Sequence, residues 1–437
     1  HSQFSNQRLA APLQDELRLK PHPIVSLLST LAVANHERTV LRSPPRVSKH
    51  VAYCGTPYRA VFNYLKNTTG ICSSCLASAK TSIPSREHNF GQPSICRARN
   101  METPHAPART VTPAYDDFSG IDMTAFANPY DALIAASKDD PKQIQSRYST
   151  HREARNAAQK EKLLAPDFSG VMIDPILLRL EDPSIEPGFV DTRNCLVFWA
   201  RPPDKVKALV KACQEKLKAV VPNLWLMPPN SLHMTALEIT HSRTPAEIDA
   251  LVANLAPSIP SIVNHTNSSP SHRARVVRPL LGFDASAIAL SFVPAVSGEG
   301  LVDGKDLGGR ERQAGDDAYT YHHLRRDLFA KATEAGVKVD SRYVVPSAHL
   351  TVARFIREED FWVEGERGVV DARKVRRLVE RIEEVNEWLR REFWPNEGGR
   401  IKEGGEWVVG EGKGLDFRRG TLWYGSGGET VTLGEGF

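Results

Sequence analysis

The chain has 437 residues, 41% of them hydrophobic and 25% charged, and a net charge of +4. This composition supports a buried core and excludes collagen-like and fully disordered proteins, and the length predicts two to three domains or one large domain with tails. The first hundred residues carry 13 Lys and Arg but only 4 Asp and Glu, so the rest is mildly acidic and has no overall basic field for nucleic acid. The longest apolar run near the N-terminus, residues 23–34, is shorter than the roughly 20 residues that span a bilayer, so no transmembrane helix and no membrane partner are expected.

Residues 1–127 predict a tail and linker that is disordered or lies outside the native protein. The first hundred residues are rich in Ser, Pro and Arg and show no sustained helical or strand period. The first Met is Met101, and we expect the working protein to begin at or near it. Four of the six cysteines lie here, and Cys72 and Cys75 lack the second close pair of ligands that a zinc site needs.

Residues 128–190 predict a helical arm and an irregular connector. Asp140 and Pro141 form a good helix start, as cap and first-turn residue. The stretch that follows, to residue 164, has few large apolar residues, so we expect it to pack on the outside of the core. Repeated Pro and Gly between residues 166 and 188 indicate the connector.

Residues 191–437 carry a pattern of strands and helices that occurs twice. Apolar runs predict strands at about 195–200, 232–239, 276–282, 287–293 and 348–355. Helical spacing of apolar residues predicts helices at about 204–222, 244–255, 319–335 and 371–394. The order predicts an α+β fold of two similar lobes related by a pseudo-two-fold axis, each a sheet with helices on one side.

Two cysteines of this region, Cys195 in a strand and Cys213 on the inner face of a helix, lie in apolar surroundings. Two buried thiols without a disulfide framework favour a reducing compartment, so we expect a cytoplasmic or nuclear protein. We also expect a monomer.

Each half contains the same short motif. Residues 230–239 read NSLHMTALEI and residues 346–355 read PSAHLTVARF. Because side chains alternate along a strand, His233 and Thr235 share one face, and so do His349 and Thr351. Pairing of the two lobes would bring two His and two Thr around one cleft, although polar residues on half-exposed strands would give the same pattern.

This arrangement resembles the two-histidine phosphoesterase superfamily, whose hallmark is a pair of His-x-Thr-x motifs, one per lobe. The similarity covers roughly residues 194–433, and FWARPP at 198–203 and LWYG at 422–425 are similar to a fungal branch described as RNA ligase/cyclic nucleotide phosphodiesterase-like. The resemblance implies metal-free cleavage of cyclic phosphodiesters, especially 2′,3′-cyclic phosphates of nucleotides or RNA ends. It places the catalytic positions on His233, Thr235, His349 and Thr351.

The same residues suit this chemistry without the family name. Opening a cyclic phosphate needs a base for the attacking water and an acid for the leaving oxygen, and two imidazoles can serve as that pair. The Thr hydroxyls can donate to the non-bridging oxygens as charge grows on them. The sequence leaves open which His is acid and which is base. It contains no His-Glu-x-x-His motif and no Gly-rich phosphate loop, so we expect neither a metal nor a cofactor.

Other residues are weaker candidates for binding substrate. Trp199 and Tyr343 could each stack on a base, and Arg201 could meet a phosphate, although packing explains both rings as well. Regular alternation turns Arg354 away from His349, which favours an ion pair at the edge of the core over substrate contact. Plain surface roles are expected for the remaining histidines considered, which are His241, His265, His272, His322 and His323.

Two other interpretations remain open from the sequence. One is a nucleotide- or RNA-binding module without turnover, and the other is a 2′–5′ RNA ligase or RNA 3′-end exonuclease that uses the same cleft. The acidic core weakly disfavours long RNA, because contacts to phosphates need Lys and Arg.

Overall fold

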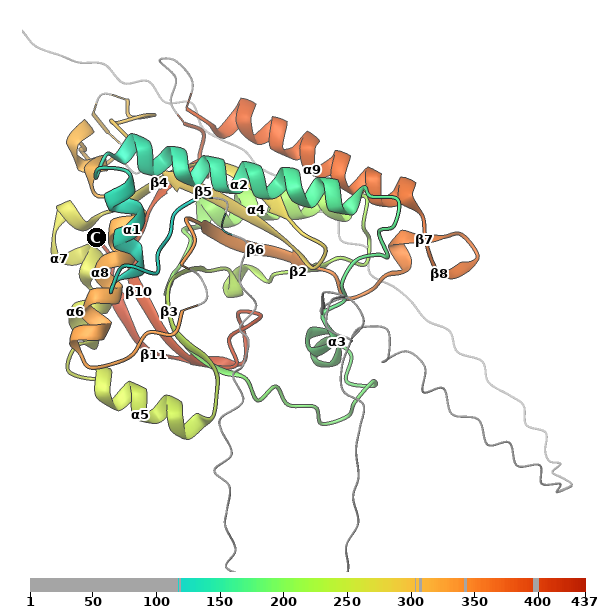
Figure 1. Cartoon of the computed structure of the whole chain (residues 1–437), viewed down its shortest axis with the longest axis horizontal. Coiled ribbons are helices and arrows are strands. Elements are labelled where there is room, and N and C mark those ends of the chain that lie inside the picture. The colour runs from blue at the N-terminus through green and yellow to red at the C-terminus, as the bar shows by residue number, and fades with distance from the viewer. Residues whose placement is uncertain (1–116, 118, 303, 306–308, 342–343, 396–400) are drawn as a thin grey trace, which may run out of the picture. The chain divides into compact units, whose positions relative to one another are not determined.

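The computed structural model describes residues 117–437, apart from 118, 303, 306–308, 342–343 and 396–400 (Figure 1). All described residues belong to one compact unit. The predicted tail lies outside the described residues as far as residue 116, and so do Cys72 and Cys75.

Two antiparallel sheets form the framework of the described region, which confirms the α+β class. The first sheet has the strand order β11-β10-β1-β3, the second has the order β2-β6-β5-β4-β9, and β7 pairs with β8 in a separate hairpin. The strands are β1 (Asn194–Ala200), β2 (Trp225–Leu226), β3 (Met234–Arg243), β4 (Arg275–Phe283), β5 (Ala287–Pro294), β6 (Ala348–Arg354), β7 (Trp362–Val363), β8 (Glu366–Val370), β9 (Glu406–Val408), β10 (Lys413–Gly420) and β11 (Gly428–Glu435).

Helices cover both sheets. The second sheet is covered by α2, α4 and α9, and Figure 1 shows α2 and α9 side by side across it, whereas α5, α6 and α8 contact strands of the first sheet. The helices are α1 (Pro129–Ala136), α2 (Pro141–Leu163), α3 (Pro175–Glu181), α4 (Asp204–Lys218), α5 (Pro245–Leu255), α6 (Ile259–Val263), α7 (His265–Ser268), α8 (Tyr321–Glu334) and α9 (Ala372–Phe393).

The helix starts follow from local chemistry. The side chain of Asp140 accepts a hydrogen bond from the backbone N–H of Lys142, and Pro141 takes the first helical position, as predicted. Thr320 caps α8 in the same way, by accepting from the backbone of His322 and His323. The apolar stripe of α9 is buried as its spacing predicts, whereas its Arg and Glu residues form ion pairs with one another near solvent.

Buried aromatic residues tie the helical arm to the rest of the fold. Tyr130 and Tyr148 are at most 1% exposed and belong to the main apolar core. Both hold His322, because the Tyr148 hydroxyl contacts Nδ1 at 3.0 Å and the Tyr130 carbonyl contacts Nε2 at 2.9 Å. The surface role expected for His322 is therefore wrong, and the same correction applies to His323 and His265, which are each 5% exposed. His322 and His323 are expected at a helix start and His265 in a polar loop, and neither local position predicts their interior partners, such as Tyr319 beside His265.

Strands β3 and β6 lie against one another where the two sheets meet. Each of them has an irregularity in its pairing just beyond the motif threonine. No helix in the described part of the chain is both long and apolar enough to cross a bilayer.

Candidate active site

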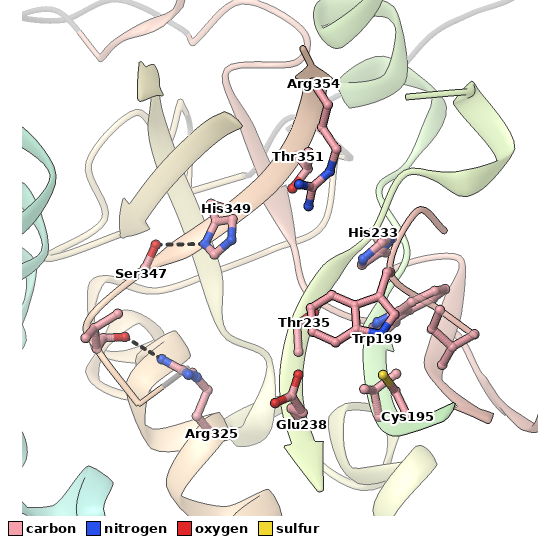
Figure 2. Close-up of a pocket in the computed structure, with 14 residues that line it drawn as sticks. Cys195, Trp199, His233, Thr235, Glu238, Arg325, Ser347, His349, Thr351 and Arg354 are labelled. Atoms are coloured by element: carbon pink, nitrogen blue, oxygen red, sulfur yellow. Dashed lines mark hydrogen bonds between the residues drawn. The ribbon is translucent and has the colours of Figure 1, made fainter. Parts of the chain in front are cut away.

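The two His-x-Thr motifs meet in one cleft between β3 and β6 (Figure 2). Its walls include all four residues on which the sequence argument depends, His233, Thr235, His349 and Thr351. The other lining residues are Cys195, Val197, Trp199, Glu238, Arg325, Val345, Ser347, Arg354, Leu422 and Trp423.

The ring of His233 is held from two directions. Its Nδ1 lies 2.7 Å from the backbone carbonyl oxygen of Ser231, and its plane stacks on the indole of Trp199 with centroids 3.7 Å apart. A carbonyl can only accept, so Nδ1 carries the proton and the lone pair of the neutral ring is on Nε2. Burial lowers the pKa of His233 to about 3, and the charge of Arg201 acts in the same direction.

The loop that supplies this carbonyl is itself tightly packed. Gly425 has a φ of +74° and lies so close to the loop that a Cβ there would be 2.5 Å from the carbonyl oxygen of Ser231. A residue with a side chain at this position would therefore displace the group that orients His233.

The ring of His349 is held by a different kind of group. Its Nδ1 lies 2.9 Å from the hydroxyl oxygen of Ser347, two residues earlier. A hydroxyl can donate or accept, so this contact allows either tautomer. Burial lowers the pKa of His349 to about 4, followed by the nearby charges of Arg155 and Arg325.

An irregularity in β3 brings a carboxyl group into the cleft. Thr235 pairs with Trp199 and Leu237 pairs with Phe198, so β3 has one extra residue, Ala236, at this point. Such a bulge reverses the alternation of faces. Glu238 consequently pairs with Val197 and lines the same cleft as Thr235.

A bulge in β6 likewise changes the face on which Arg354 lies. Thr351 pairs with Ala289 and Ala353 pairs with Ile288, which leaves Val352 as the extra residue. Arg354 therefore lines the cleft together with Thr351, and the expectation from regular alternation is wrong. Arg354 also makes an ion pair with Asp174 at 3.6 Å, as the sequence argument favoured.

The wall of the cleft below His349 includes a buried arginine from α8. Arg325 is 2% exposed and donates to the backbone carbonyls of Ala236 at 3.3 Å and Val345 at 2.8 Å. It thereby connects the strand of one motif to the segment before the other. The apolar spacing of residues 319–335 does not predict that Arg325 is buried in the wall of the cleft, because its burial depends on how α8 packs in the folded protein.

Two of the three residues predicted to bind substrate, Trp199 and Arg201, instead contact parts of the protein beside His233. Trp199 is 1% exposed and its ring faces His233, so it orients the imidazole instead of offering an open face to a base. Arg201 pairs with Asp416 at 2.8 Å and donates to the carbonyls of Asn230 and Leu232, so it braces the loop before His233. Tyr343 lies outside the described residues.

The described part of the chain holds no group of three or more His, Cys, Asp or Glu side chains that could bind a metal ion. Cys195 and Cys213 are both free thiols and both buried, as their apolar surroundings predict. Cys195 lies in the wall of the cleft.

Comparisons with known proteins give little further information. No family model matches the chain, and no curated protein matches it. Among solved structures, the chain is similar to TT0787 of Thermus thermophilus, with 15% sequence identity over 55% of this chain and 96% of that chain and a TM-score of 0.29.

Proposed function

We propose that this protein is a metal-independent phosphodiesterase of the two-histidine phosphoesterase superfamily, which opens 2′,3′-cyclic phosphates of nucleotides or RNA ends. The observation that supports this most directly is the meeting of two His-x-Thr motifs, from strands of two different sheets, in one cleft. Each imidazole is held at Nδ1 by a group of its own motif, which is how a ring is oriented for proton transfer through Nε2.

We further propose that the two halves are related by duplication, as the sequence pattern predicts. Support comes from connectivity, since β1, α4 and β3 follow one another in the same way as β5, α8 and β6. In each unit the first and last strands pair in antiparallel fashion. The helices are exchanged, because α4 contacts β6 and α8 contacts β3.

In the proposed reaction His233 is the base and His349 is the acid. The neutral ring of His233 has its lone pair on Nε2, so it can take a proton from water as the water oxygen bonds to phosphorus. The bond between phosphorus and one ribose oxygen breaks on the opposite side. Protonated His349 gives its proton to that oxygen, and the product is a nucleoside monophosphate.

Charge around the cleft suits an anionic substrate. Burial keeps the pKa values of both histidines below neutrality, so neither ring is charged at neutral pH before substrate binds. A bound phosphodiester brings a negative charge, which favours protonation of His349. The hydroxyls of Thr235 and Thr351 can donate to the non-bridging oxygens, and Arg354 supplies positive charge to the same cleft.

The test is turnover of a 2′,3′-cyclic nucleotide by the full chain in excess EDTA, with chromatography that separates the 2′- and 3′-monophosphates. We expect a single isomer to dominate, because one fixed acid protonates one leaving oxygen. Loss of turnover in EDTA would contradict the metal-independent mechanism. Tight nucleotide binding without product would instead favour the binding module.

A further inference from the structure

A buried carboxylate lies behind the aromatic stack that holds His233. Asp416 on β10 is directly opposite Trp199 on β1, and directly opposite residues of two paired strands share one face of the sheet. The carboxyl group therefore lies on the same side of the sheet as the indole that stacks on His233 (Figure 2). The side chain of Asp416 is 4% exposed, and it is not one of the residues that line the cleft.

Asp416 is the partner of two arginines that lie over the same indole. Its Oδ2 accepts from Arg201, whose Nε and Nη2 are both 2.8 Å away, and Nη1 of Arg418 lies 3.7 Å from the same oxygen. The two guanidinium groups lie 4.8 and 5.0 Å from the ring centroid of Trp199. The other oxygen, Oδ1, accepts from the hydroxyl of Thr430 at 2.8 Å. The carboxylate is thus held at both oxygens, and it partly offsets two like charges beside the indole.

Through Arg201 this network reaches the loop that orients His233. Nη1 of Arg201 donates to the backbone carbonyls of Leu232 at 3.2 Å and Asn230 at 3.4 Å. The carbonyl oxygen of Ser231, which lies between them in the chain, is 2.7 Å from Nδ1 of His233. A guanidinium group is planar and rigid, so a carboxylate that holds its Nε and Nη2 also fixes the direction of Nη1. The carboxylate therefore holds the loop on both sides of the carbonyl that contacts the imidazole.

We propose that Asp416 is a positioning residue for His233, which acts through Arg201 and the Ser231 carbonyl to keep a single ring tautomer; this inference rests on the proposed function, in which His233 is the base. The hydrogen bond at one nitrogen of a neutral imidazole decides which nitrogen carries the proton. With the carbonyl in place, Nδ1 keeps the proton and Nε2 offers its lone pair to the attacking water.

Removal of the negative charge should release this arrangement. The two guanidinium groups then repel one another beside the indole without a carboxylate between them, and Arg201 no longer has a partner that fixes its direction. The loop loses its hold on the carbonyl, and the imidazole exchanges between its two tautomers. In one of these Nε2 carries the proton and cannot accept another from water.

The first measurement is the tautomer of His233, which does not depend on turnover. In the full chain labelled at its histidine nitrogens, NMR shifts at neutral pH report which ring nitrogen carries the proton, and the signal of His233 is identified by its loss in His233→Ala. We expect the proton on Nδ1 in the unaltered protein and a mixture of tautomers in Asp416→Asn, which keeps the shape and removes the charge.

Asp191→Asn is the matched control. The side chain of Asp191 is 5% exposed, and its two oxygens accept from Nε and Nη2 of Arg193, both at 2.8 Å. This arginine then donates to the hydroxyl of Tyr424. The control therefore removes an equally buried charge from a similar pair, and we expect it to keep the single tautomer of His233.

The second measurement is the kinetics of 2′,3′-cyclic nucleotide opening. Asp416→Asn should lower kcat roughly tenfold to a hundredfold, which is the cost of a small misplacement of a reacting group. KM should change little, because Asp416 is not in the wall of the cleft. Arg201→Gln should lower kcat to a similar extent, and the double variant should be no slower than either single variant, since both residues act through one loop.

The results separate this inference from the proposed function. An unchanged tautomer in Asp416→Asn, or an equal change in Asp191→Asn, would overturn the role of Asp416 and leave the phosphodiesterase standing. A mixture of tautomers in Asp416→Asn alone, in a protein that opens no cyclic nucleotide, would support Asp416 and overturn the phosphodiesterase. If Asp416→Asn does not fold, Thr430→Val removes the hydroxyl that donates to the carboxylate and leaves every charge in place. A single tautomer in Thr430→Val would then contradict the inference, and a mixture would support it.

Discussion

The indole of Trp199 lies flat against the imidazole of His233, with ring centroids 3.7 Å apart and planes inclined by 13°. The same indole also contacts the guanidinium groups of Arg201 and Arg418, at 4.8 and 5.0 Å from its centroid. The stack removes water from one face of the imidazole. It therefore contributes to the burial that keeps the pKa of His233 low.

Trp199→Ala should lower both stability and kcat. Removal of a buried indole costs about 3–5 kcal/mol of unfolding free energy, and the loss of the stack lets His233 turn. NMR titration should show the pKa of His233 rising from about 3 toward its usual value as water reaches the ring. Trp199→Phe, which keeps a flat ring, should show a smaller change in each quantity. An unchanged pKa of His233 in Trp199→Ala would contradict this role for the indole.

The pH profile of kcat/KM should be displaced to the acid side. In the free enzyme, burial lowers the pKa of His233 to about 3 and that of His349 to about 4. The reaction needs one protonated ring, and above a pKa the protonated fraction falls tenfold for each pH unit. We expect kcat/KM to rise as the pH falls from 7 toward 5, whereas the kcat profile should lie closer to neutrality because the bound phosphate favours the imidazolium. A kcat/KM optimum above pH 7 would count against this assignment.

The acid limb of that profile needs a folding control. His322 is buried with its pKa lowered to about 3, and an unfolded histidine has a pKa of about 6.5. Below pH 6.5 the unfolded chain thus binds more protons than the folded chain. The contribution of His322 to the free energy of unfolding is therefore fully present above pH 6.5 and is lost as the pH falls through its pKa in the folded protein. Circular dichroism at each pH would separate unfolding from titration of the site.

Ser347→Ala should reduce kcat, and Ser231→Ala should not. The hydroxyl of Ser347 holds Nδ1 of His349, whereas the backbone carbonyl of Ser231 holds Nδ1 of His233 and remains after the substitution. Loss of one hydrogen bond of about 1 kcal/mol corresponds to roughly a fivefold lower kcat. Equal losses in both variants, measured by initial rates at saturating substrate, would show that the hydroxyls do not act through this contact.

Thr235→Val and Thr351→Val should each lower kcat roughly a hundredfold with a small change in KM. Each substitution removes a hydroxyl that can donate to the phosphate oxygens as their charge increases, and it keeps the branched shape of the side chain. Steady-state kinetics of the two variants would measure the change in kcat separately from the change in KM. A loss confined to KM would mean that the hydroxyls bind ground-state substrate only.

Much of the framework could be predicted from the sequence, because the long apolar patterns are regular. Strand β1 and helices α4, α5, α8 and α9 lie close to where periodicity places them. The meeting of His233 and His349 in one cleft also follows the repeated motif. Short elements such as β2 and the β7–β8 hairpin have no pattern of their own, since their pairing depends on distant partners.

The polar residues around the motifs are harder to predict. Alternation fails for Glu238 and Arg354 because a single bulged residue reverses the faces, and a bulge leaves no mark in hydrophobic periodicity. The expectation for His322 is wrong because its partners, Tyr130 and Tyr148, come from the arm far earlier in the chain. Such contacts depend on how distant segments pack, which local patterns do not report.

The most direct test of the two-imidazole mechanism is the rate of 2′,3′-cyclic nucleotide opening by His233→Ala, His349→Ala and the double variant, each in the full chain. Residues that act as one acid–base pair are not additive, so we predict that either single substitution lowers kcat about as far as both together. If either single variant keeps a rate near that of the unaltered protein, or if the two losses simply multiply, the histidines do not work as a pair.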